Sequence, residues 1–352
     1  MIWEKKMKKV LTFVISIFLL MGCSPSQSPI NQEQSEQFLT DIFPIKEEIL
    51  KQDSCELLNI TENELESFQF EFGVIEDDYC NVLITIIHTD NYTKTTDSFD
   101  LEYEKTENQW FNIDMHPRGQ YIEPTFTVTK DIVSKVINEY MDNHTDLGFN
   151  GTDDKNKYDE IIINDFVISN EEKENNFEFG STNLKANITC KYDTSMLKEV
   201  AKYNINFKYE NDGTWTCKEL LPDGKATLNY SFDGTYKPYT SDDNDKVKGD
   251  IIVSGQLSRI GERTIKNNEI VDELNESFET KGNMTVKCTV FWLPLNSYRD
   301  VTCQYNLVDD GLWNFLSLEG SEGIANFNPK NEVIFFTSEV SSLMPSMGIK
   351  KI

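Results

Sequence analysis

The chain is short of the residues that most reaction chemistry uses. It contains only three histidines, at positions 88, 116 and 144, and no two of them are spaced to ligate a metal from one helix. A Cys-x-x-Cys pair, a phosphate-binding loop and a dinucleotide fingerprint are all missing. Gly320-Ser-Glu-Gly323 lacks the spacing of a nucleophile elbow. We therefore expect no catalytic residue, no metal site, no cofactor and no enzymatic activity.

Basic residues are also scarce. Lysine and arginine together number 33 against 60 acidic residues, and the formal net charge is −27. Arginine occurs only at four positions, Arg118, Arg259, Arg263 and Arg299. Nucleic-acid binding needs clustered lysine and arginine, so this balance excludes a nucleic-acid partner. The acidic run Asp242–Asp245 lacks the glycine and closing glutamate of an EF-hand loop, so we interpret it as a solvated loop.

An apolar run occurs near the amino terminus. Val10–Leu20 is interrupted only by Thr12 and Ser16, and four lysines precede it. A charged start followed by a short apolar core is typical of an export signal. The run is too short to span a membrane comfortably, which takes about 20 residues. An uncleaved membrane helix is the alternative interpretation.

The signal ends in Leu20-Met21-Gly22-Cys23, which resembles the lipobox of bacterial lipoproteins. The resemblance implies that residues 1–22 are removed and that Cys23 carries a diacylglyceryl group. Residues 23–35 are then the lipidated cysteine and a flexible tether, because their polar composition cannot bury a core. Abundant lysine and asparagine are typical of AT-rich Gram-positive bacteria. We expect the membrane as a partner through the lipid anchor, on the extracytoplasmic face of the cell membrane.

Three segments repeat one pattern, an alternating strand, a polar turn and a second strand that begins with tryptophan. They lie at 99–113, 205–220 and 303–318. Asn211-Asp-Gly213 and Asp309-Asp-Gly311 predict tight hairpin turns, because glycine supplies the positive φ. The three tryptophans are predicted core anchors, with ligand-facing aromatics as the alternative: Trp110, Trp215 and Trp313.

Helices are predicted before each hairpin. Apolar residues from Ile132 to Met141 fall on one helical face, and Thr129 is placed to cap it. Phe38–Ile49 gives a weaker stripe that Pro44 breaks or kinks. Glu269–Phe278 is the predicted helix of the third unit.

These elements predict an α+β fold of tandem small modules, each an antiparallel sheet with one packed helix. The predicted bounds are 36–122, 123–223, a more β-rich module at 224–330, and a carboxy-terminal tail at 331–352. The hairpin pattern resembles nuclear-transport-factor-like or cystatin-like modules, a resemblance that implies no activity.

Six cysteines follow Cys23, two in each predicted module. An even number in an exported chain favours disulfides. The distribution favours one bridge per module, with free buried thiols as the alternative: Cys55 with Cys80, Cys190 with Cys217, and Cys288 with Cys303.

The sequence therefore predicts a non-enzymatic cell-surface lipoprotein that interacts with a protein, a peptide or an envelope component. Three alternatives remain open. One is a small-ligand receptor with pockets between helix and sheet. Another is an envelope hydrolase with a carboxylate pair. The last is self-protection, in which the anchored modules block a toxin or lytic enzyme.

Overall fold

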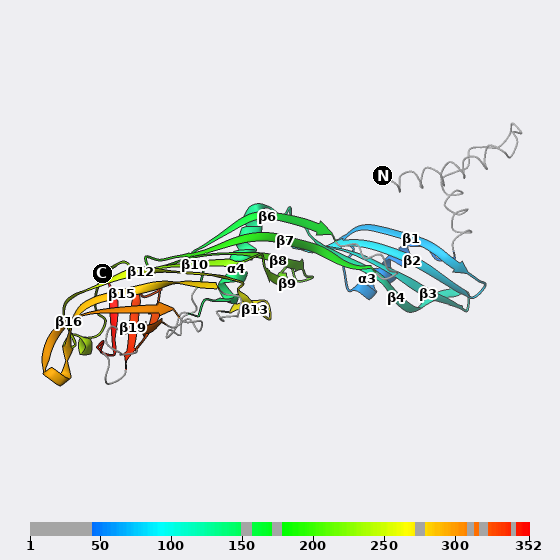
Figure 1. The fold of residues 1–352 in the computed structure, drawn as a ribbon. Coiled ribbons are helices and arrows are strands. Elements are labelled where there is room, and N and C mark those ends of the chain that lie inside the picture. Colours follow the sequence, from blue (N-terminus) through cyan, green and yellow to red (C-terminus); the bar gives the residue numbers. More distant parts are fainter. Residues whose placement is uncertain are drawn as a thin grey trace, which may run out of the picture. The chain divides into compact units, whose positions relative to one another are not determined.

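The computed structural model describes residues 44–148, 157–170, 178–271, 279–307, 313–316, 323–338 and 343–352 (Figure 1). Within them it contains twenty β-strands and two α-helices. The described residues up to Thr85 and Ser98–Pro117 form unit 1. Ile86–Asp97 and the described residues from Arg118 onward form unit 2, so β2, β3 and β4 have residues in both.

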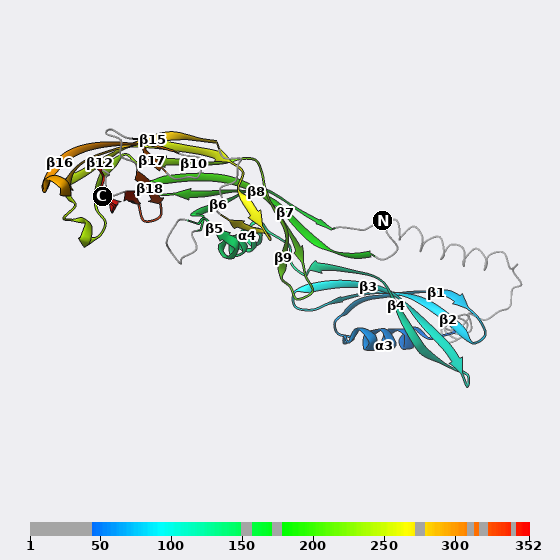
Figure 2. The same ribbon diagram turned by 60° about the horizontal axis from the view of Figure 1, so that its bottom comes forward.

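Unit 1 packs one helix against strands. Its elements are α3 (Glu47–Leu58), β1 (Leu65–Ile75), β2 (Tyr79–Thr89), β3 (Thr93–Thr106) and β4 (Gln109–Pro124). β1 pairs with β2, and β2 with β3. α3 lies along one side of these strands (Figure 2), and Tyr103 on β3 donates a hydrogen bond to Asp53 on α3 at 2.8 Å. The helix ends at Asn59, whose left-handed conformation terminates it.

The first part of unit 2 is an antiparallel sheet. Its strands are β6 (Glu160–Asn170), β7 (Glu178–Asp193), β8 (Leu197–Tyr209), β9 (Trp215–Pro222) and β10 (Ala226–Ser231). β7 lies between β6 and β8, and its first residues also pair in parallel with β4. One end of β8 pairs with β9 and the other with β10. The alternating burial along β8 gives this sheet one core face and one solvent face.

The second part of unit 2 is a closed ring of eight strands within the described residues. The strands are β11 (Gly234–Pro238), β12 (Val247–Gly261), β15 (Glu279–Trp292), β16 (Ser297–Leu307), β17 (Trp313–Leu316), β18 (Gly323–Asn328), β19 (Val333–Ser338) and β20 (Met347–Lys351). Each pairs antiparallel with the next, from β12 through β15 to β20, and β20 returns through β11 to β12. Closure leaves these strands fewer free edges. β10 also pairs with β12, which joins the ring to the first sheet.

One helix and a small sheet complete unit 2. α4 (Lys130–His144) buries Val133, Ile137 and Met141, and Tyr140 packs edge-on against Phe207 with 5.3 Å between ring centroids. The small sheet comprises β5 (Thr145–Asp146), β13 (Thr264–Lys266) and β14 (Glu269–Val271). Two short 3₁₀ turns, η1 (Ser241–Asp243) and η2 (Leu293–Leu295), lie between ring strands.

The predicted fold class is wrong. The described chain is mostly strand, in one large sheet with two α-helices, and not a row of α+β modules that each carry a packed helix. The reason is that alternation predicts strands without predicting their partners. β8 pairs with β10 across the predicted module boundary at residue 223, so hairpins that were assigned to different modules share one sheet.

The local predictions had mixed outcomes. The helix at 132–141 and its Thr129 cap are confirmed, with the Thr129 hydroxyl accepting from the Ile132 N–H. The turn at Asn211–Gly213 is confirmed between β8 and β9, with Gly213 at φ +80°. The first helix begins at Glu47, later than predicted, and residues 38–43 lie outside the described chain.

The predicted helix at Glu269–Phe278 is wrong in its described part. Glu269–Val271 is strand β14, paired with β13, and residues 272–278 lie outside the described chain. Asn267 and Asn268 both adopt positive φ, which makes the two-residue turn of a hairpin. Asparagine tolerates that conformation, so the Asn-Asn pair was the missed signal.

Candidate functional site

A straight row of polar residues crosses four strands on the solvent face of unit 2. The register places Lys198 on β8 opposite Asn229 on β10, Asn229 opposite Ser258 on β12, and Ser258 opposite Lys281 on β15. Directly opposite residues on antiparallel strands share a face of the sheet. The row therefore carries a lysine at each end. Its two central side chains are joined, because the Ser258 hydroxyl donates to Asn229 Oδ1 at 3.1 Å.

This row lines a hollow of about 410 Å³. The other lining residues come from the turn before β8 and from the adjacent positions of the strands: Thr194, Ser195, Met196, Tyr230, Ser231, Gln256 and Leu257. The lining holds two lysines and no aspartate or glutamate, although acidic residues outnumber basic ones 60 to 33 in the chain. A second hollow of about 350 Å³ includes Asp165 and Glu219 beside Lys185. The first hollow is thus the cationic one.

Two acids lie near the edge of the hollow. Asp193 contacts the Lys198 ammonium at 3.3 Å, and Glu332 accepts a hydrogen bond from Ser195. The Asp193 and Lys198 side chains are 59% and 70% exposed, and exposed pairs of this kind contribute little. A competing anion can therefore replace Asp193 at small cost. Lys281 is exposed and has no ion pair within the described residues.

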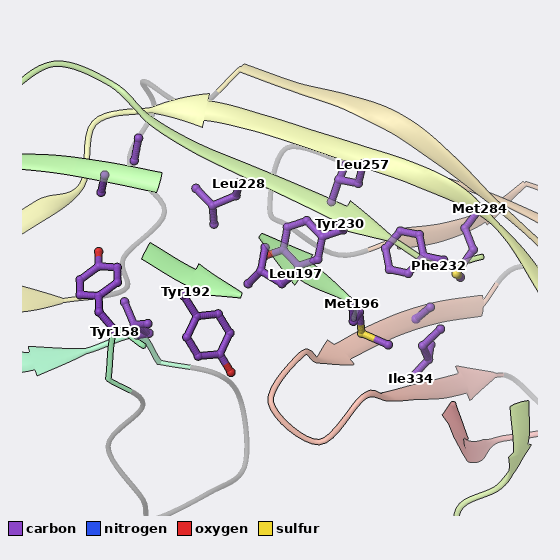
Figure 3. Packing of buried hydrophobic residues seen from close by; sticks show 14 of the residues in the cluster. Tyr158, Tyr192, Met196, Leu197, Leu228, Tyr230, Phe232, Leu257, Met284 and Ile334 are labelled. Carbon is purple, nitrogen blue, oxygen red and sulfur yellow. The ribbon is translucent and has the colours of Figure 1, made fainter. Parts of the chain in front are cut away.

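The hydrophobic core lies on the other face of the sheet from the lysine row. Leu197, Leu228, Tyr230 and Leu257 project into the core from β8, β10 and β12, on the side opposite the lysine row (Figure 3). Tyr230 is 8% exposed and Leu257 3% exposed, so both side chains are buried in that core. This packing holds the strands that carry the row at fixed spacing.

A buried ion pair fixes the strand that carries Lys198. Its neighbour Glu199 projects to the opposite face, where Arg263 donates from Nε to Glu199 Oε1 at 3.0 Å and from Nη2 to Oε2. The Tyr158 hydroxyl donates to Oε1 at 2.9 Å and lies 2.8 Å from the Tyr203 hydroxyl. Burial raises the pKa of Tyr158 well above its ordinary value, so its hydroxyl stays protonated as a donor. A charge-assisted cluster of this kind specifies where β8 lies.

The structure places Trp110 and Trp215 outside the lining of both hollows. Trp110 is half-buried, with the Lys105 ammonium 5.6 Å from its ring centroid. Trp215 packs edge-on against Tyr209 at 5.0 Å between centroids and supports the core. Trp313 begins β17, and its side chain lies outside the described part. Among the described side chains, no tryptophan and no residue of α3 or α4 lines either hollow.

The six described cysteines are free thiols in this structure. Cys190 lies opposite Ala201 of β8, whereas Cys217 lies opposite Phe207 on the other side of that strand, so the register separates this predicted pair. Cys288 and Cys303 are brought together, diagonally across β15 and β16. Burial raises the pKa of each of these two thiols to about 12. Cys55 and Cys80 lie buried on α3 and β2 of unit 1.

A partly buried histidine–aspartate pair lies outside the hollow. His88 Nε2 contacts Asp97 Oδ2 at 2.8 Å, and Gln120 donates to Asp97 Oδ1 at 2.9 Å. A hydrolytic dyad of this type would also need a nucleophile on the other ring nitrogen. Within the described residues, no hydroxyl or thiol is hydrogen-bonded to His88.

The predicted lipidation site Cys23 lies outside the described residues, as do the signal at 1–22 and the tether at 23–35. Among the described helices, none has the length and apolarity that membrane crossing requires. No family model, curated protein or solved structure matches the chain.

Proposed function

We propose that this protein is a lipid-anchored, non-enzymatic lipoprotein of the extracytoplasmic face that binds an anionic envelope component through the lysine-lined hollow. The Leu20–Cys23 ending of the signal supports the location. The observation that carries the binding function is a hollow with two lysines and no carboxylate in a chain of net charge −27. The acidic surface as a whole repels an anionic ligand. A cationic lining therefore marks a place where such a ligand can bind.

The spacing of the lysines indicates the class of ligand. Lys198 and Lys281 are separated by three inter-strand steps, or about 14 Å between their backbones at ~4.8 Å per step. Asn229 and Ser258 lie between them and supply hydrogen-bonding groups. An extended ligand with anionic groups at intervals and hydroxyls between them matches this row better than one small ion. Anionic envelope polymers with polyol or sugar units have that chemistry.

The test is a calorimetric titration of the mature chain carrying Cys23→Ser with poly(glycerol phosphate), at low and at physiological salt. Lys198→Gln with Lys281→Gln should weaken binding about tenfold, as two exposed ion pairs of roughly 0.7 kcal/mol each would give. Binding should also weaken with salt, because exposed charges are screened.

The matched control is Lys225→Gln with Lys237→Gln, which removes the same charge from exposed lysines outside the hollow. It should bind as the parent does. Equal losses in both double variants would show a diffuse charge effect and contradict the site. Neutral dextran should not bind. If it did, binding would not require anionic groups, which would contradict the proposed class of ligand.

A further inference from the structure

The hairpin end between β15 and β16 exposes large apolar side chains. Leu293 is 79% exposed, the highest value among the large apolar side chains that the structure describes, and Leu295 is 65% exposed. Both belong to the 3₁₀ turn η2, which lies at the orange end of unit 2 in Figure 1. Pro294 and the left-handed Asn296, whose N–H donates to Leu293 O at 3.0 Å, fix this turn. The leucines are therefore held outward by a locally determined turn.

Aromatic rings and one cation lie directly behind the leucines. The Arg299 guanidinium lies 4.8 Å from the Trp292 ring centroid, and Phe291 packs edge-on against Tyr298 at 5.3 Å. Tyr298 donates to the Asp245 carbonyl at 3.0 Å, which orients its ring. From the tip inward, the hairpin carries leucines, then aromatic rings, then a cation. Membrane proteins place these residue types in the same order between the acyl chains and the headgroups.

The charge of this hairpin end differs from that of the chain. Cys288–Arg299 contains no aspartate or glutamate, although 60 of the 352 residues are acidic. The first acid of β16 is Asp300, which accepts a hydrogen bond from Thr289 at 2.6 Å. An acid within this segment would oppose entry into an apolar phase, since burying an unpaired charge is costly.

We propose that the β15–β16 hairpin end enters the interfacial region of a lipid bilayer, with Leu293 and Leu295 among the acyl chains and Trp292 and Tyr298 at headgroup level. The three-residue turn η2 is too small to supply the roughly 800 Å² per partner that a stable protein interface buries. A lipid surface deforms around a convex tip and requires no matching pocket. The proposal uses no residue of the lysine-lined hollow, and only its cellular setting rests on the proposed lipid anchor.

The test measures partitioning of the mature chain onto phosphatidylcholine vesicles, with Cys23→Ser so that no acyl anchor contributes. The parent should co-sediment with vesicles, and its tryptophan fluorescence should be quenched by brominated lipid. Leu293→Ser with Leu295→Ser should lower the partition coefficient at least tenfold. Trp292→Phe should remove most of the quenching.

The matched control is Val74→Ser with Ile75→Ser, which removes two apolar side chains that are 51% and 50% exposed at the end of β1. It should partition as the parent does. A parent chain that does not bind vesicles, or equal losses in both serine variants, would overturn the proposal. A tip variant that abolishes self-association in gel filtration, with no vesicle binding by the parent, would identify a second copy as the occupant.

The hollow variant Lys198→Gln with Lys281→Gln should bind vesicles normally. Failure of the polymer titration and failure of the vesicle assay are therefore separate results.

Discussion

Arg263 and Glu199 form an ion pair from which water is excluded, with side chains that are 2% and 0% exposed and Arg263 Nε lying 3.0 Å from Glu199 Oε1. Glu199 lies beside Lys198 on β8, so the cluster that orders this strand lies directly beneath the candidate site. Water cannot solvate either charge if its partner is removed.

Removing one partner of this pair should therefore strongly destabilise the fold. We expect Arg263→Met to lower the free energy of unfolding by about 3–5 kcal/mol, because it leaves a buried carboxylate uncompensated. Glu199→Leu combined with Arg263→Met should recover most of that loss. Urea unfolding measures both. The exposed pair Lys191–Glu160, at 2.9 Å, is the control, and Lys191→Ala should cost less than about 1 kcal/mol. A single variant as stable as the parent would contradict the structural role.

Strands β12 and β15 approach so closely at Gly255 that a side chain there would overlap the neighbouring backbone. A Cβ added there would lie 2.2 Å from the Asn283 carbonyl oxygen, and φ is +142°. We expect Gly255→Ala to destabilise by about 1–3 kcal/mol more than Gly224→Ala, owing to the backbone overlap. Gly224 also has a positive φ, +82°, but open space around its Cβ position. Gly224→Ala therefore measures the cost of the backbone conformation alone, without steric overlap. Equal melting temperatures for the two variants would contradict this packing.

Asp243 should make stability depend on pH in the acid range. Burial raises its pKa, but hydrogen bonds from Lys246, Thr240 and the Gly348 N–H outweigh burial and leave the pKa below its ordinary value. Its stabilising effect is complete above the unfolded-state pKa of about 4 and is lost as pH falls through the lower folded-state pKa. Asp243→Asn should cost about 1.5–3 kcal/mol at pH 7 and progressively less below pH 4.

Unfolding curves at pH 7, 4 and 3 measure that difference. The neighbouring exposed Asp242→Asn serves as the control and should shift stability little. A constant difference between parent and Asp243→Asn at all three pH values would be inconsistent with the assigned hydrogen bonds.

Thiol labelling should distinguish the redox states of the cysteines. Cys217 is half-buried, whereas the other five described cysteines are buried, so we expect Cys217 to react first in the native chain at pH 8. The pKa of about 12 for Cys288 and Cys303 predicts slow labelling until unfolding. Mass mapping after unfolding without reductant should find six thiols in the Cys23→Ser chain. Four thiols, with Cys288 and Cys303 unlabelled, would instead reveal one of the three disulfides that the sequence favoured.

Features set by near neighbours were predictable. The α4 helix follows from its apolar phase and the Thr129 cap, and the β8–β9 turn follows from Gly213. The candidate site was not predictable, because its row joins Lys198, Asn229, Ser258 and Lys281 from four strands. In the sequence, each of these residues is one of many solvent-facing polar positions on an alternating strand, and nothing local marks the four as a group.

The sequence by itself determined the alternation of the strands, the capped helix α4 and the Asn211–Gly213 turn, because each depends on contacts within a few residues. Only the tertiary structure decided that β8 pairs with β10, that β11 and β20 close the ring, and that two lysines 83 positions apart share one hollow. The physical reason is that every strand offers two edges to any partner of suitable pattern, and a shift of one residue would turn each side chain to the other face. That choice is made by the packing of the whole sheet.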